Sequence, residues 1–250
     1  MTLGNDEDLN GLKAIGRICA NVLQHMSTAV RPGMTTAELD LIGRRMLEAA
    51  GARSAPESCY NFPGATCISI SEEVAHGIPG ERVIKEGDLV NIDVSAEKDG
   101  YFADTGASFT VGRSVPAVER LCRDGKRALW VGLKEVKAGK PLAEVGNAIG
   151  AFAAKNRYTL IANLASHGIG RSLHEEPQEL STWPDPDETR IMTEGLVFTI
   201  EPFLSLGGHW AEDGDGDSWT LFSEPRAPTV QFEHTLVATR NGPLVLTLAD

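Results

Sequence analysis

The segment Leu89-Val90-Asn91-Ile92-Asp93-Val94, followed by the turn-like Lys98-Asp99-Gly100, says most about the fold. Apolar and polar residues alternate in it, which is the period-two pattern of a strand with one buried face. The valine and isoleucine side chains then share one face, and Asn91 and Asp93 share the other. Aspartate is disfavoured in strands, so Asp93 is a candidate functional residue.

Further acidic residues stand in similar surroundings. Asp104 follows the turn, so a hairpin could bring it close to Asp93. Glu201 follows an apolar run, and Glu233 lies inside another strand-like segment. Any one of these carboxylates alone would fit a solvated strand face. Four carboxylates converging on one core would repel each other unless cations compensated them, so the set predicts a cation site.

Two histidine-bearing segments add nitrogen donors. His167 and His174 lie in a glycine-rich stretch that lets the backbone approach a ligand closely, and His76 is held among turn residues. One histidine with four carboxylates makes an oxygen-rich set that suits hard or borderline divalent ions, and bridging carboxylates favour two ions over one. His25 and His209 are not expected to be ligands.

The pattern on either side of these motifs predicts two helices followed by strands, twice over. Thr35 and Glu38 form a capping-box pair at the start of the second helix, and Gly51 is a plausible residue just beyond its end. This order predicts one internally duplicated α+β domain over residues 1–250, with a central antiparallel sheet and helices on one face. Residues 1–8 are expected to be a flexible N-terminus. The expected helices are 9–26, 35–51, 116–136 and 142–154, and the expected strands are 67–70, 89–94, 108–111, 160–161, 196–201, 229–239 and 244–248.

Composition narrows the class of protein. The 250 residues include 23 basic and 35 acidic side chains, a formal net charge of -12, which disfavours general binding to DNA or to an anionic membrane. No run reaches the roughly 18 apolar residues of a membrane span, and the acidic start 5–8 is unlike a signal peptide. Four cysteines without a C-x-x-C pair indicate neither a disulfide scaffold nor a cysteine zinc site. We therefore expect a cytoplasmic protein with reduced thiols.

Taken together, the motifs resemble those of type I methionine aminopeptidases, the single-domain form of the pita-bread fold, from about residue 9 to residue 247. The motifs occur in the order of that family. They are Cys67-Ile-Ser-Ile, Ala75-His-Gly-Ile-Pro, Asn91-Ile-Asp-Val, Ala103-Asp-Thr, Ser166-His-Gly-Ile-Gly, Leu173-His-Glu-Glu-Pro, Thr199-Ile-Glu-Pro and Gln231-Phe-Glu-His-Thr.

The resemblance implies a dinuclear-metal aminopeptidase that removes the initiator methionine from nascent proteins when the second residue is small. It makes Asp93 a ligand of one ion, Asp104 and Glu233 bridges, and His167 and Glu201 ligands of the other. Glu201 would also be the general base. The two divalent ions could be Co, Mn, Fe or Zn.

The resemblance also assigns the residues that touch substrate. His76 and His174 would contact the scissile amide. Two departures from the family pattern, Leu173 and Phe203, affect the shape of the methionine pocket. The wall of that pocket would consist of Tyr60, Phe62, Cys67, Phe203 and Trp219.

Alternatives and partners stay open at this stage. An Xaa-Pro aminopeptidase or dipeptidase of the same fold would share the five ligands, and a non-catalytic pita-bread binding protein would be expected to lose some. We expect a monomer that meets nascent N-termini. The segment 113–140, from Arg113 to Lys140, carries eight basic and three acidic residues and is a candidate ribosome contact, although a solvated helix face explains it equally well. The acidic loop from Glu212 to Asp217 would face away from it.

Overall fold

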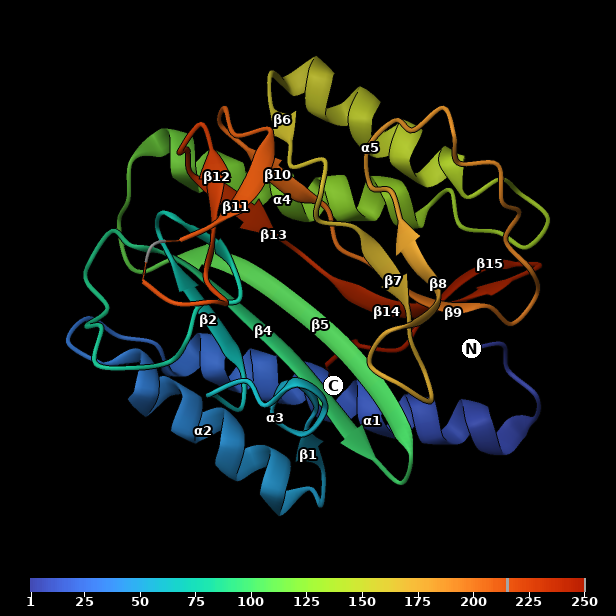
Figure 1. Ribbon diagram of the computed structural model, residues 1–250, viewed down its shortest axis with the longest axis horizontal. Coiled ribbons are helices and arrows are strands. Elements are labelled where there is room, and N and C mark those ends of the chain that lie inside the picture. The colour runs from blue at the N-terminus through green and yellow to red at the C-terminus, as the bar shows by residue number, and fades with distance from the viewer. Residues whose placement is uncertain (215, 250) are drawn as a thin grey trace.

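The computed structural model describes residues 1–214 and 216–249, so Asp215, within the acidic loop, and Asp250 lie outside the described residues. Helices and strands alternate in two similar blocks along the chain (Figure 1). The helices are α1 (Asp6–Ala29), α2 (Thr36–Ala49), α3 (Ala55–Tyr60), α4 (Pro116–Leu133) and α5 (Ala143–Asn156).

The strands of the first block are β1 (Arg53–Ser54), β2 (Cys67–Ile70), β3 (Glu73–Ala75), β4 (Leu89–Lys98) and β5 (Tyr101–Thr110). Those of the second block are β6 (Thr159–Leu160), β7 (Ser166–Gly168), β8 (Glu175–Leu180), β9 (Val197–Ile200), β10 (Phe203–Ser205), β11 (Trp210–Asp213), β12 (Leu221–Glu224), β13 (Thr229–Gln231), β14 (His234–Thr239) and β15 (Gly242–Val245). Strand pairing within the described ranges is antiparallel throughout and divides the strands among four small sheets.

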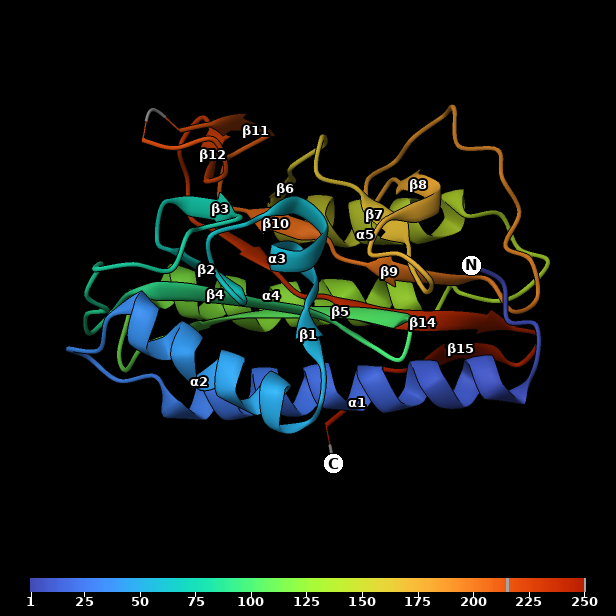
Figure 2. The ribbon, with the colours of Figure 1, turned by 60° about the horizontal axis from the view of Figure 1, so that its bottom comes forward.

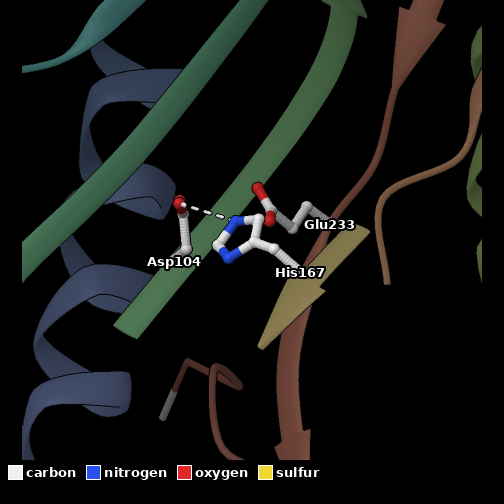
Figure 3. Close-up of side chains that lie close together, drawn as sticks. All are labelled: Asp104, His167 and Glu233. Atoms are coloured by element: carbon white, nitrogen blue, oxygen red, sulfur yellow. Dashed lines mark ion pairs between the residues drawn. The ribbon is translucent and has the colours of Figure 1, made fainter. Parts of the chain in front are cut away.

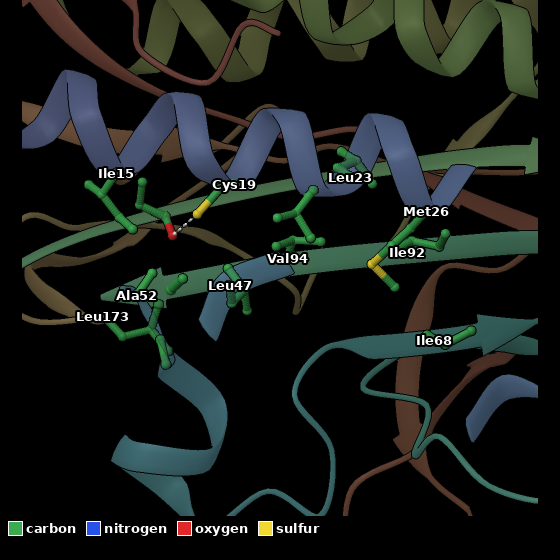
Figure 4. Close-up of a cluster of buried hydrophobic side chains, with 14 of the residues drawn as sticks. Ile15, Cys19, Leu23, Met26, Leu47, Ala52, Ile68, Ile92, Val94 and Leu173 are labelled. Atoms are coloured by element: carbon green, nitrogen blue, oxygen red, sulfur yellow. Dashed lines mark hydrogen bonds between the residues drawn. The ribbon is translucent and has the colours of Figure 1, made fainter. Parts of the chain in front are cut away.

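The long hairpin β4–β5 is the centre of the first half. One face of β4, including Val90, Ile92 and Val94, is fully buried against α1 and α2. Figure 4 shows this core, in which the Cys19 thiol lies 3.5 Å from the carbonyl oxygen of Ala103. Since strand side chains alternate, the opposite face of β4 is left for polar side chains. That face points away from α1, toward α3, β8 and the β11–β12 hairpin (Figure 2).

The second half has its own core. Helices α4 and α5 pack on each other and on β9, β10 and β14 through a separate cluster that includes Leu121, Leu133, Ile149 and Phe198. The two halves meet where β5 runs beside β13 and β14. Hydrogen bonds from both backbone and side chains connect β5 there to the segment that includes β13 and β14.

Most predicted elements are confirmed, and the α+β class with antiparallel strands holds. The Thr35–Glu38 capping box is present, and Gly51 has a φ of 68° just after α2. The expected strand 229–239 is wrong as a single element, because Phe232 and Glu233 separate β13 from β14. The short helix α3, the strands β1, β3, β7, β8 and β10 and the β11–β12 hairpin were not predicted, and α3 lies across β4 from α1 and α2 (Figure 2).

The first residues make more contacts than a flexible N-terminus implies. Helix α1 already begins at Asp6, capped by the side chain of Asn5. The Met1 ammonium pairs with Glu175, and the Met1 carbonyl accepts from the Val197 backbone N–H. Backbone groups at and just before the start of β9 give this segment its partners, because Thr2 forms a bridge with Leu196 and the Leu3 N–H donates to the Gly195 carbonyl. Within the described ranges, no helix combines the length and apolar character needed to span a bilayer.

Candidate metal centre and substrate cavity

Hairpin register places the first two carboxylates. Asp93 is opposite Gly106, and Ser95 is opposite Asp104. Residues opposite each other in an antiparallel pair share a face, so Asp93 and Asp104 are diagonal neighbours on the face away from α1. A side chain at position 106 would obstruct this face, because a Cβ there would lie 2.1 Å from Oε1 of Gln231.

The break between β13 and β14 delivers Glu233 to the same place. The Glu233 backbone N–H donates to the Gly106 carbonyl over 2.9 Å, and the Thr105 hydroxyl donates to the Glu233 carbonyl over 2.8 Å. One residue pair further on, the Thr235 hydroxyl donates to the Asp104 carbonyl over 2.7 Å. These bonds hold two strands of different halves in a fixed alignment, and Glu233 itself is 1% exposed.

His167 and Glu201 come from the neighbouring strands of the second half. His167 lies in β7, and Glu201 directly follows β9, where its backbone N–H donates to the Ser166 hydroxyl over 2.9 Å. His167 Nε2 is 3.6 Å from Glu201 Oε1 and 3.9 Å from Asp104 Oδ2. Figure 3 shows Asp104, His167 and Glu233 converging, and one potential ligand atom from each lies within 4.8 Å of the others.

The motif-based reasoning gave no role to Gln231, which links the carboxylates. Its side-chain amide lies 3.1 Å from Glu233 Oε2 and 3.4 Å from Asp93 Oδ2, while Asn91 donates to its carbonyl oxygen over 2.8 Å. The signal was available in the sequence, because Gln231 and Asn91 are polar residues two positions from predicted ligands. The motifs did not reveal the role of Gln231, because a side-chain amide is a weak metal ligand and gives no reason by itself to expect a place in a cation site.

Burial and mutual repulsion dominate the electrostatics of the centre. Loss of solvation raises the pKa of Asp93 to about 6. Burial, followed by the charges of neighbouring carboxylates, raises the pKa of Asp104, Glu201 and Glu233 well above the usual range. Burial together with nearby His174 lowers the pKa of His167 to about 3, so this imidazole is neutral and available as a ligand.

Two oxygen atoms of the centre lack partners. Asp104 Oδ1 and Glu233 Oε1 are buried and have no hydrogen-bond partner in the part of the chain that the structure describes. Buried polar atoms are normally satisfied, so two such atoms among four carboxylates call for a ligand. Carboxylate oxygens with one neutral imidazole fit divalent cations.

The centre forms the floor of a cavity of about 620 Å³. Every residue that the sequence analysis assigned to the site lines this cavity except Glu233, which is buried beneath it. His76 and His174 lie on its wall and are exposed. Partial loss of solvation lowers the pKa of both imidazoles, and the charge of His76 adds to the effect on His174. His174 Nδ1 is 2.7 Å from the Tyr60 hydroxyl, and its ring lies 4.0 Å from that of His167.

The residues expected to form a methionine pocket gather on one side. Phe62, Cys67 and Phe203 are buried, and Trp219 is half-buried with its ring edge-on to Phe62 at 5.3 Å. Tyr60 stands at the rim on α3 and is 44% exposed. The geometry therefore supplies an apolar recess next to the carboxylates. His25 and His209 are exposed and do not line the cavity.

Comparison with known proteins agrees with this geometry. The model of metallopeptidase family M24 matches residues 10–240. A methionine aminopeptidase of Staphylococcus epidermidis is 47% identical, covering 100% of both chains, and methionine aminopeptidase 2 of Bacillus subtilis is 44% identical, covering 99% of both. The crystal structure of methionine aminopeptidase from Rickettsia prowazekii superposes with a TM-score of 0.94 at 31% identity, over 99% of this chain and 100% of that one.

Proposed function

From the premise that the chain belongs to metallopeptidase family M24, we propose that it is a methionine aminopeptidase acting on nascent chains whose second residue is small. The observation that carries the proposal is the convergence of Asp104, His167 and Glu233 at the floor of an open cavity. Full-length similarity to methionine aminopeptidases supports the choice of substrate over other peptidase activities.

Five side chains would hold the metal. Asp93 would bind one ion, His167 and Glu201 the other, and Asp104 and Glu233 would bridge them. The unpartnered buried oxygens of Asp104 and Glu233 support the bridging roles. Two divalent ions, of Co, Mn, Fe or Zn, would supply an activated water and stabilise negative charge on the substrate carbonyl.

The chain's own groups handle the proton and the amide. Glu201 would accept the proton of the attacking water and pass it to the leaving amine, and the Thr199 hydroxyl, 3.2 Å from Glu201 Oε1, orients that carboxylate. His76 and His174, whose lowered pKa values keep them neutral near pH 7, would hold the scissile amide by hydrogen bonds. The apolar recess would take the methionine side chain, lined by Tyr60, Phe62, Cys67, Phe203 and Trp219.

Peptide cleavage tests the proposal against its rivals. Apoprotein is supplied with each metal in turn and offered Met-Ala-Ser, Met-Lys-Ser and Ala-Pro peptides. We expect release of methionine from Met-Ala-Ser, little from Met-Lys-Ser, and none after chelation. Faster cleavage of Ala-Pro would favour an Xaa-Pro peptidase, and no cleavage with any metal would favour a binding protein.

A contact with the ribosome would suit this substrate, and the described surface offers one place for it. Basic side chains of α4 and α5, together with Trp130, line a groove on the side of the molecule carried by these helices. They concentrate positive charge on a chain whose net charge is -12. The basic residues are Arg123, Lys126, Arg127, Lys134 and Lys155.

Charge reversal tests this surface. Lys126→Glu combined with Lys134→Glu should weaken sedimentation with ribosomes and reduce its salt dependence, while the exposed pair Lys13→Glu and Arg45→Glu on α1 and α2 serves as control. Equal binding by both double variants would reject the groove. We propose a cytoplasmic monomer, with the acidic loop turned away from this groove.

A further inference from the structure

The cavity extends beyond what a methionine and a small second residue need. Its volume of about 620 Å³ falls in the range of pockets that enclose drug-sized ligands. Its outer wall contains two indoles from unrelated segments, Trp183 after β8 and Trp210 at the start of β11. Trp210 is 50% exposed, whereas Phe203 on the floor is 4% exposed. The indoles therefore lie toward the mouth, where later residues of a bound peptide must leave.

Trp210 is held firmly although its side chain is exposed. The side chain of Asn163 forms two hydrogen bonds with the backbone of Ala211, the residue after Trp210. It accepts from the Ala211 N–H over 2.7 Å and donates to the Ala211 carbonyl over 2.8 Å. On the other side, the His209 N–H donates to the Glu224 backbone carbonyl over 2.9 Å and the His209 carbonyl accepts from the Ala162 N–H over 3.0 Å. A backbone fixed on both sides holds residue 210 at the cavity wall, where half of its side chain is exposed.

Two acidic residues share the strand face of this indole, and a third lines the cavity. Glu224 lies opposite Trp210 across the β11–β12 pair, and Glu212 lies two residues along β11, so both share its face. Glu179, which is exposed, lines the cavity beside Trp183. The same hairpin face already receives a cation, because the Arg226 guanidinium lies 3.8 Å from the centre of the Phe222 ring. Aromatic faces beside carboxylates attract cationic side chains.

We propose that Trp183 and Trp210 form an outer subsite that recognises the residues after the second residue of the substrate and prefers lysine or arginine there. This inference rests on the proposed function, because the carboxylate centre at the floor sets where the peptide begins. The outer subsite would select substrates by the residues after the second, in addition to the requirement for a small second residue.

Cleavage of matched pentapeptides tests the subsite. Met-Ala-Ser-Gly-Gly is compared with peptides that carry one Lys or one Glu at position three, four or five. For the wild-type holoenzyme we expect kcat/KM to rise about two- to fivefold with Lys at the best position, as an exposed cation–π contact allows, and to fall with Glu. Trp210→Ala and Glu179→Gln should each reduce the ratio of kcat/KM for the Lys peptide to kcat/KM for the matching Glu peptide.

Trp130→Ala is the matched control, since Trp130 is also exposed but lies in the α4–α5 groove. Equal kcat/KM for Lys and Glu peptides would overturn the subsite, as would an equal effect of Trp130→Ala. Binding of the same peptides to metal-loaded Glu201→Gln, followed by tryptophan fluorescence, tests the subsite without turnover. Preferential binding of Lys peptides there, with no cleavage by wild type, would support the subsite and contradict the proposed function.

Discussion

Glu201 would combine the proposed roles of metal ligand and general base in one carboxylate, because it lies 3.6 Å from His167 and lines the cavity. Glu201→Gln removes a ligand charge and the proposed base together. We expect kcat to fall more than about 10²-fold. Steady-state kinetics on Met-Ala-Ser with saturating Mn²⁺ measure this, with exposed Glu194→Gln as control. Near-normal turnover would move the base elsewhere.

Trp219 illustrates why an aromatic residue after an acidic loop is informative. A large indole in an exposed loop is expected to pack against another apolar group. In the structure it is half-buried and packs edge-on against Phe62. Trp219→Ala should raise KM for Met peptides, or relax the choice of the first residue toward Leu by about tenfold, with little change in melting temperature. Competition between Met-Ala-Ser and Leu-Ala-Ser measures the choice. A much lower melting temperature with unaltered specificity would make Trp219 a core residue.

At the scale of the element, the β4–β5 hairpin depends on Gly106. A methyl group at this position would lie 2.1 Å from the Gln231 carbonyl oxygen, and Gln231 holds both Asp93 and Glu233. Gly106→Ala should therefore lower metal affinity about 10- to 100-fold, as loss of a supporting contact around ligands does. Competition with a chelator measures the affinity. Gly80→Ala, where a methyl group meets nothing within 4 Å, is the control, and equal affinities in the two variants would contradict the argument.

Elements with strong local patterns were predictable, and those defined by distant contacts were not. β2 and the polar face of β4 follow from alternation, and the start of α2 follows from its capping box. β11 is short and largely exposed, and it is a strand because β12 and Asn163 pair with it. The interruption at Phe232–Glu233 likewise depends on β5, because the Gly106 carbonyl of β5 accepts a hydrogen bond from the Glu233 N–H. Local sequence carries no information about such partners.

For the whole molecule, the buried carboxylates should make the apoprotein sensitive to pH. The raised pKa values mean that the folded state binds more protons than the unfolded state, so stability falls as pH rises through them. Above about pH 7.5, one unit past the ordinary histidine pKa of about 6.5, His167 is neutral in both states and no longer opposes this trend. We expect the melting temperature of apoprotein to fall from pH 7.5 to 8.5, and the gain on adding Mn²⁺ to grow.

Calorimetry of apo and metal-loaded protein across this range measures both effects. Glu233→Gln removes one of the repelling charges and should flatten the slope for the apoprotein. Glu194→Gln, which is outside the centre, should keep it. A melting temperature of apoprotein that is constant or rises from pH 7.5 to 8.5 would show that burial does not raise the pKa values of these carboxylates into this range.

The junction of β5 with β13 and β14 makes formation of the centre depend on docking of the two halves. Asp93 and Asp104 belong to one half, and His167, Glu201 and Glu233 to the other. A molecule whose halves have not docked would present at most a partial set of the proposed ligands. Hydrolytic activity would therefore require the long-range contact between the two halves.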